Sequence, residues 1–283
     1  MLKRNLKFGV EIEFFGATRE EVARKLREKN IEARVEGYNH VTQEHWKLVT
    51  DSSVNPRGCG NMNDHGNEIV SPILYGIEGL KELETVCNTL EEVGAKVDRT
   101  CGIHVHHDIT DMNIEQIKNI FKIYNKYNNY IENIMPRSRR AEARNTYCQP
   151  FSEREKEVMY NATTLQEMKQ GLVDRFKTVN FTSYTKYGTL EFRQHSGTVE
   201  YEKIKAWVLT TAKMIDKAKD KKKVNPIKSE QERQELKRIE QRFFKELEIE
   251  GEEFMVIREY WKERRKKFQE EKREREARRA TRR

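Results

Sequence analysis

The chain has 283 residues, of which 36% are charged and 36% are hydrophobic. The charged share is well above the roughly 25% that is usual for soluble domains, while the length allows one large domain or two small ones. Residues 217–283 contain 24 Lys and Arg against 16 Asp and Glu, and residues 1–216 contain 31 of each, so the net charge of +8 lies in the last quarter. This composition excludes a wholly disordered chain, and the basic pI does not mark residues 1–216 as a nucleic-acid binder.

Nothing in the sequence indicates a membrane or secreted protein. There is no run of about 18 apolar residues, and charged residues at Lys3 and Arg4 interrupt any apolar signal segment at the start. The four cysteines are far apart and form no Cys-x-x-Cys pair, unlike a disulfide framework or a zinc finger. We therefore expect a cytoplasmic protein with reduced thiols.

The hydrophobic pattern predicts strands and helices throughout residues 1–216. Residues 7–15 alternate between apolar and polar, which is typical of a strand with one buried face. The further elements that we expect, in chain order, are a helix after Thr18, two short strands within 31–49, a loop rich in Gly and Asn at 55–67, a strand from Glu68, a helix at 76–94, strands at 96–98 and 102–108, a helix at 114–134, a basic irregular segment at 137–150, a helix at 164–173, a strand pair at 177–184 and 188–194, and a helix at 201–217. Because several strands follow one another directly, we expect an α+β fold with a mainly antiparallel sheet.

The last quarter of the chain differs in composition from the rest. Lysines at 219–223 followed by Asn225-Pro226 indicate a linker, and residues 229–248 have the apolar spacing of an amphipathic helix. Residues 262–283 are almost entirely Lys, Arg and Glu, as in a solvated helix or a disordered tail. We therefore expect one domain at 1–216 and a charged helical or partly disordered extension at 217–283.

Three of the expected strands carry ionisable residues two positions apart, which places them on one face of each strand, with apolar residues on the other. These residues are Glu11 and Glu13 on the first strand, His104 and His106 on the second, and Glu191, Arg193 and His195 on the third. Each pattern alone is common on solvated strand edges. If the three strands share a sheet and a helical layer behind it, the pairs together predict an active site on the open face.

Clustered carboxylates raise one another's pKa values, so a site of this composition needs a compensating cation. Oxygen ligands with one or two imidazoles favour Mg²⁺ or Mn²⁺, and the lack of thiolate pairs disfavours structural zinc. The residues therefore predict a divalent metal centre.

Seven segments occur in a characteristic order: Phe8-Gly-Val-Glu-Ile-Glu-Phe, Trp46 followed by Asp51-Ser-Ser-Val, Glu68-Ile-Val-Ser-Pro, Cys101-Gly-Ile-His-Val-His, Met135-Pro-Arg-Ser-Arg-Arg, Arg175-Phe-Lys-Thr-Val-Asn, and Gly188-Thr-Leu-Glu-Phe-Arg-Gln-His-Ser-Gly-Thr. Over residues 6–216 the sequence thereby resembles the amidoligase family, ATP-dependent carboxylate-amine ligases related to glutamine synthetase and glutamate–cysteine ligase. The resemblance implies a curved, mainly antiparallel sheet backed by helices, as in glutamine synthetase. It also implies that ATP phosphorylates a carboxylate and that an amine then displaces the phosphate to give an amide.

The resemblance also implies a role for individual residues. Glu11, Glu13, Glu68 and Glu191 would bind Mg²⁺ or Mn²⁺ together with His104 or His106, and the choice between the two histidines stays open. Arg193 would contact the transferred phosphoryl group, Glu191 would share in catalysis, and Asp51 would orient or deprotonate the amine. The expected contacts to ATP or to a substrate carboxylate come from Arg137, Arg139, Arg140, Arg175 and His195. Two positions depart from the family pattern: Ser52 replaces a usual Gly, and Phe176 replaces a usual Tyr.

Two other functions fit parts of the sequence. A metal-dependent hydrolase could use His104, His106 and the carboxylates to activate water without ATP. A nucleic-acid-binding protein could use the basic residues of 217–283, although the interleaved glutamates favour a solvated helix. For the ligase we expect small-molecule, amino-acid or peptide substrates selected by loops at 55–67 and 141–165, and a homo-oligomer in which a neighbouring subunit supplies Asp51 remains an alternative.

Overall fold

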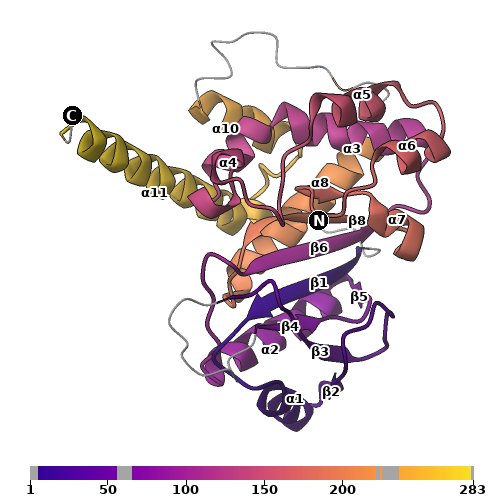
Figure 1. Cartoon of the computed structure of the whole chain (residues 1–283), viewed down its shortest axis with the longest axis vertical. Coiled ribbons are helices and arrows are strands. Elements are labelled where there is room, and N and C mark those ends of the chain that lie inside the picture. Colours follow the sequence, from indigo (N-terminus) through magenta and orange to yellow (C-terminus); the bar gives the residue numbers. More distant parts are fainter. Residues whose placement is uncertain (1–5, 56–65, 221–223, 225–235, 282–283) are drawn as a thin grey trace.

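A computed structural model describes residues 6–55, 66–220, 224 and 236–281 (Figure 1). Eight strands form one sheet in the order β2-β3-β4-β1-β6-β8-β7, with β5 paired to β1. The strands are β1 (Lys7–Phe14), β2 (Ala33–Val35), β3 (Trp46–Thr50), β4 (Asn67–Val70), β5 (Leu74–Tyr75), β6 (Gly102–Asp108), β7 (Val179–Asn180) and β8 (Thr189–Ser196). Within the described residues, β2 and β3 pair in parallel and the other named pairs are antiparallel, which confirms the expected sheet type.

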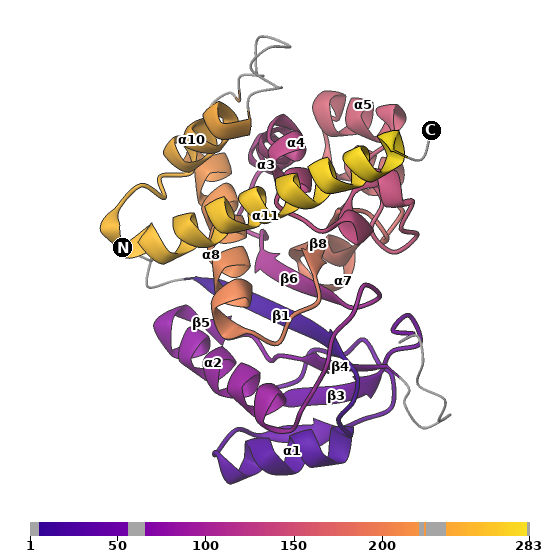
Figure 2. The ribbon, with the colours of Figure 1, turned by 90° about the vertical axis from the view of Figure 1, so that its left-hand side faces the viewer.

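Helices cover one face of this sheet. The α-helices are α1 (Arg19–Glu28), α2 (Gly76–Glu92), α3 (Ile114–Lys126), α4 (Asn128–Asn133), α5 (Glu153–Asn161), α6 (Leu165–Gly171), α7 (Thr182–Tyr187), α8 (Tyr201–Asp220), α10 (Leu236–Glu246) and α11 (Met255–Ala280), with short 3₁₀ helices at Arg137–Arg139, Ala141–Ala143 and Glu252–Phe254. Figure 2 shows α1, α2 and α8 in front of the sheet, with α11 lying across α8. None of the helices in these described ranges has both the length and the apolar content that a bilayer crossing requires.

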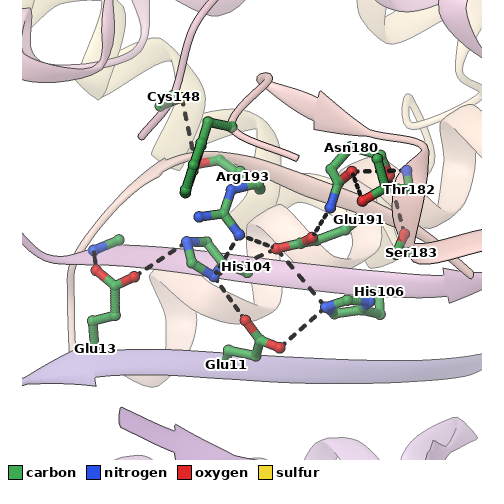
Figure 3. Close-up of polar contacts among 12 residues, drawn as sticks. Glu11, Glu13, His104, His106, Cys148, Asn180, Thr182, Ser183, Glu191 and Arg193 are labelled. Carbon is green, nitrogen blue, oxygen red and sulfur yellow. Dashed lines mark hydrogen bonds and ion pairs between the residues drawn. The ribbon is translucent and has the colours of Figure 1, made fainter. Parts of the chain in front are cut away.

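The two-residue period of β1 separates its two faces as the sequence predicts. Phe8, Val10 and Ile12 are buried towards the helices, and such alternation holds a strand in a single register because a slip of one residue would expose the whole apolar set. Glu11 and Glu13 consequently point to the opposite face (Figure 3). The core-facing residues of β6 and β8 follow the same pattern over most of their length.

Several elements differ from the pattern-based expectation. The segment at 96–98 makes only an isolated bridge between Phe15 and Lys96, and the helix expected at 114–134 is interrupted at Tyr127. The strand expected at 177–184 ends after Asn180, because the Asn180 side chain accepts hydrogen bonds from the backbone N–H and the hydroxyl of Thr182 at 2.8 Å and so starts α7.

One helix, α5, lies within the segment 141–165, for which the sequence pattern predicts a loop. Its start carries a capping box, in which the Ser152 side chain accepts from the Glu155 N–H and the Glu155 carboxylate accepts from the Ser152 N–H. The spacing Ser-x-x-Glu before Val158 and Met159 was therefore a readable helix signal.

The C-terminal quarter packs on the sheet's helical layer. Helix α8 continues past residue 216 to Asp220, and Phe243 of α10 and Trp261 of α11 belong to the same hydrophobic core as the sheet. The side chains of residues 269–281 are exposed or half-exposed on the end of α11 that projects from the body (Figure 1). The helical extension is thus confirmed, whereas the division at 216/217 stays a proposal and residues 225–235 lie outside the described ranges.

Candidate active site

Four neighbouring strands deliver the ionisable residues to one place. Strand pairing aligns Glu13 with Glu68, Glu11 with His104, and His106 with Glu191, so the order β4-β1-β6-β8 becomes a continuous polar patch. This confirms the expectation that β1, β6 and β8 lie side by side, and β4 extends the patch with Glu68. The patch lines a cavity of about 880 Å³. The cavity lies on the face opposite α8, whose Thr211 contacts His107 on the other side of β6. Figure 3 shows the contacts among the side chains of the patch.

His104 lies at the centre of the patch. Its Nδ1 is 2.8 Å from Oε2 of Glu11, and its Nε2 is 3.3 Å from Oε1 of Glu13. The other oxygen of Glu13 accepts a 2.6 Å hydrogen bond from the backbone N–H of Gly102. His104 is thereby held on both sides by carboxylates.

The second histidine connects Glu11 to the strand on the other side. Nε2 of His106 is 3.3 Å from Oε1 of Glu11 and 3.9 Å from Oε1 of Glu191, while its Nδ1 contacts the Thr189 hydroxyl at 3.0 Å. The burial of His106 alone would lower its pKa, but Glu191 and Glu11 raise it above the usual value. Burial likewise favours protonation of Glu11, yet its contacts with His104 and His106 hold the pKa of Glu11 well below its usual range.

Glu191 is compensated from two directions. Asn180 donates to its Oε2 at 2.6 Å, and the guanidinium of Arg193 contacts its Oε1. Although burial acts to raise the pKa of Glu191, Arg193 and His106 lower it overall. The pKa of Arg193 is raised despite burial, because Glu191 and Glu11 stabilise its charge.

At Glu68 the compensation is too weak, because Arg193 alone among the causes acts to lower the pKa. Burial and the charges of Glu11, Glu13 and Asp51 together raise the pKa of Glu68 well above its usual value. Crowding makes these carboxylates bind protons. A divalent cation could take the place of those protons.

The donor atoms of the cluster fit a divalent cation. The described residues contain three groups of three possible metal ligands. Within each group, the ligand atoms lie no more than 4.8 Å from one another. The groups are Glu11, His106 and Glu191; Glu11, Glu68 and His104; and Glu13, Asp51 and Glu68. Nε2 of His106 is buried 3.3 Å from Oε1 of Glu11, but the contact lacks the alignment of a hydrogen bond, so this nitrogen suits a metal ligand. Because Glu11 and Glu68 each belong to two groups, the geometry suits more than one ion in neighbouring positions.

The model of the protein family described as "Putative amidoligase enzyme" matches residues 4–215. The chain therefore belongs to the amidoligase family. Among solved structures, the amidoligase is similar to the complex between the prokaryotic ubiquitin-like protein Pup and its ligase PafA, with 10% sequence identity and a TM-score of 0.41. The similarity covers 94% of this chain and 64% of that one, so the amidoligase spans less than two thirds of the length of its structural neighbour. No curated protein matches the sequence.

Asp51 and Arg175 also line the cavity of the amidoligase. Asp51 reaches the cluster from the end of β3 in the same chain, so its position there needs no neighbouring subunit. Arg175 is exposed at the mouth of the cavity, stacked on Phe176 with 4.8 Å between the guanidinium carbon and the ring centroid. Lys186 of α7 adds a second cation to this edge.

Three other arginines lie away from the cavity lining. Arg137 is more than half exposed beside Glu142. Arg139 is buried behind Gly102, where its guanidinium donates to the carbonyl of Cys101, and Arg140 donates to the carbonyl of Met135. The structure therefore does not bring these three side chains to the carboxylate cluster, and their assigned contacts with ATP or a substrate carboxylate stay predictions.

The expectation that His195 shares a face with Glu191 and Arg193 is wrong. In the pairing of β6 with β8, two residues, Arg193 and Gln194, stand opposite the single residue His104. This β-bulge shifts the alternation by one residue, so His195 points into the helical layer, where its ring lies 5.6 Å from that of Trp207.

Sequence reasoning missed the loop at 36–45, which lines the cavity from the side of β2 and β3. Buried Lys47 anchors it by donating to the carbonyls of Asn39 and Val41 at 3.0 and 2.9 Å. The loop also contacts the opposite end of the sheet, because the Tyr187 hydroxyl of α7 donates to the carbonyl of His40 at 2.8 Å. This long-range contact had no local signal in the sequence.

Proposed function

We propose that this amidoligase is an ATP-dependent carboxylate-amine ligase that forms an amide bond through an acyl-phosphate intermediate. The observation that carries the proposal is the convergence of five carboxylates and two imidazoles into three overlapping groups of metal-ligand atoms on one cavity wall. Such a set suits Mg²⁺ or Mn²⁺, and these ions supply the positive charge that phosphoryl transfer between two anions requires. The cluster lies on a mainly antiparallel sheet backed by helices, the sheet type that the resemblance implies for such ligases.

The residues of the chain divide the work of such a reaction. Glu11, Glu13, Glu68 and Glu191, with His104 and His106, would hold the cation. Arg193 extends from the same wall with Nε free of any hydrogen bond within the described residues, and its planar guanidinium suits the oxygens of a transferred phosphoryl group.

Asp51 would hold the amine substrate. It lies at the edge of the cluster, and its Oδ1 accepts from the N–H of Ser53 at 2.7 Å, which fixes its orientation. A carboxylate in this position can bind an ammonium group and accept its proton, because an amine must be neutral to attack the acyl phosphate.

The residues at the mouth of the cavity favour an amino acid or a peptide as the substrate. Arg175 and Lys186 provide cations for phosphates or for a substrate carboxylate, and exposed Tyr38, Val41 and Ile73 provide apolar contacts beside them. A mouth with both kinds of group suits a substrate that carries charged and apolar parts.

The proposal is tested by phosphate release from Mg·ATP across a panel of carboxylates and amines, with the amide product identified by mass spectrometry. We expect release only when an acid and an amine are both present. The variant Glu191→Gln should abolish it, because the charge that pairs with Arg193 is lost. Product formation from an amide or ester without ATP would instead identify a metal-dependent hydrolase.

A further inference from the structure

Helix α11 contacts the back of the strand that carries Arg193. The bulge of β8 directs Arg193 into the cavity and turns His195 to the helical side. Bulges of this kind re-aim side chains next to active sites. Since the ladder to β6 is irregular here, the direction of Arg193 depends on what holds the bulge from behind.

His195 is held by residues of α8 and α11. Its ring lies 5.6 Å from that of Trp207 and 6.1 Å from that of Trp261. Nδ1 is 2.8 Å from the carbonyl of Ser196, and Nε2 is 3.3 Å from the hydroxyl of Tyr260. Because a carbonyl can only accept, Nδ1 carries the proton and the hydroxyl of Tyr260 donates to Nε2.

Arg264 extends this chain of contacts. It donates through Nε to the carbonyl of Ile134 at 2.7 Å and through one terminal nitrogen to the hydroxyl of Tyr260 at 2.8 Å. The other terminal nitrogen is 3.4 Å from the hydroxyl of Ser196. In the part of the chain that the structure describes, no carboxylate forms an ion pair with Arg264, so its guanidinium serves these neutral acceptors. Helix α11 thus contacts two consecutive residues of β8 directly after the bulge.

We propose that Tyr260 and Arg264 are positioning residues for Arg193, which they direct at the carboxylate cluster by holding His195 and Ser196 behind the bulge. The role of Arg193 in this statement rests on the proposed function. Both positioning residues lie beyond residues 4–215, the part that matches the family. A segment of the extension is thereby part of the active-site framework.

The geometric part of the proposal is tested by hydrogen exchange of the full-length protein. Tyr260→Phe removes one hydroxyl, and Arg264→Met removes the guanidinium while keeping an apolar stem. Arg265→Met is the matched control, because Arg265 is the next residue of α11 but donates to Glu240 of α10 at 2.8 and 3.2 Å. Relative to amides of β1, amides at 193–196 should exchange roughly fivefold faster in the first two variants, as expected for the loss of one hydrogen bond, and at the wild-type rate in the control. Unchanged exchange in Tyr260→Phe overturns the proposal even if Arg264→Met fails to fold.

The functional part is tested by the affinity for the magnesium complex of AMP-PNP, measured by calorimetry in a double-mutant cycle. Tyr260→Phe should weaken binding about fivefold when Arg193 is present, again from one lost hydrogen bond, and should have no further effect in an Arg193→Ala background. Equal losses in both backgrounds would mean that Tyr260 does not act through Arg193, which overturns the assignment. If the wild type does not bind this nucleotide, the proposed function fails, while the exchange rates still decide whether α11 holds the bulge.

Discussion

Replacing Glu68 by Gln should stabilise the metal-free protein and weaken its response to metal. Glu68 faces Glu13 across the strand pair, and Asp51 lies in the same group of ligand atoms within 4.8 Å. The substitution keeps the shape of the side chain and removes its charge. A residue that serves only the fold would show the opposite effect, because loss of a satisfied polar group destabilises.

The size of the effect follows from the spacing. Two full charges no more than 4.8 Å apart repel by about 3.5 kcal/mol or more at an effective dielectric constant of about 20. The wild type avoids most of this repulsion by keeping Glu68 protonated up to its raised pKa. Because the folded pKa exceeds the unfolded one, the stability of the wild type falls as the pH rises from the usual carboxyl pKa through the raised value. We therefore expect Glu68→Gln to be more stable than the wild type by about 1 to 3 kcal/mol at pH 8, with no advantage at pH 4.

The assay is urea unfolding at pH 4 and pH 8, with and without Mg²⁺ or Mn²⁺. A cation at one hundred times its dissociation constant should stabilise the wild type by about 2.7 kcal/mol and the variant much less, so the lead of the variant should shrink or reverse. The control Glu240→Gln removes a buried carboxylate that is already paired with Arg265, and should destabilise by about 3 kcal/mol with or without metal. A Glu68→Gln protein that is less stable than the wild type at pH 8 without metal, or that gains as much from metal, would refute the assignment of Glu68 as a metal ligand.

Three further predictions concern neighbouring residues. His106→Gln should lower turnover at least tenfold and weaken Mn²⁺ binding. The control His107→Gln should change turnover and Mn²⁺ binding little, because His107 is bonded to Thr211 on the helical face at 2.8 Å. Equal losses of Mn²⁺ affinity in a calorimetric titration would contradict the assignment of His106 as a metal ligand. Asn180→Asp places a second carboxylate at the 2.6 Å contact with Glu191, and the repulsion between the two should reduce turnover more than tenfold in steady-state assays. Added metal should restore the thermal stability of this variant. A variant with normal rates would exclude Asn180 from the active site. Burial raises the pKa of the Cys101 thiol to about 12, so iodoacetamide at pH 8 should label it only after unfolding, and mass-spectrometric detection of the adduct in the folded protein would contradict its placement.

The sequence could predict the site wherever strands are regular. Glu11 and His104 alternate strictly with apolar neighbours, and burial of those neighbours against the helices leaves the polar residues a single direction. The same rule fails at His195, because a bulge inserts a residue and reverses every later side chain. A bulge depends on the neighbouring strand and on the helices behind it, so the alternation within β8 alone carries no sign of it.

Contacts between distant segments were equally out of reach. The hydrogen bond from Tyr187 to the carbonyl of His40 spans 147 positions, and the contact of Lys47 with the loop at 36–45 depends on how that loop folds back. By contrast, the capping box at Ser152 was local and readable. A structural feature was therefore predictable only where the contacts that determine it join residues close together in the sequence.

The charge balance of the cluster explains why a buried group of acids persists in this fold. Five carboxylates of the three ligand groups face two imidazoles and the guanidinium of Arg193. Even with both imidazoles protonated, the cluster is net negative, and the raised pKa of Glu68 offsets only part of this charge. Protons and divalent cations then compete for the same oxygens, so metal binding should release protons and should strengthen as the pH rises above the usual carboxyl pKa. A site selected for stability alone would replace Glu68 by a neutral residue, because its charge opposes folding unless a cation is bound.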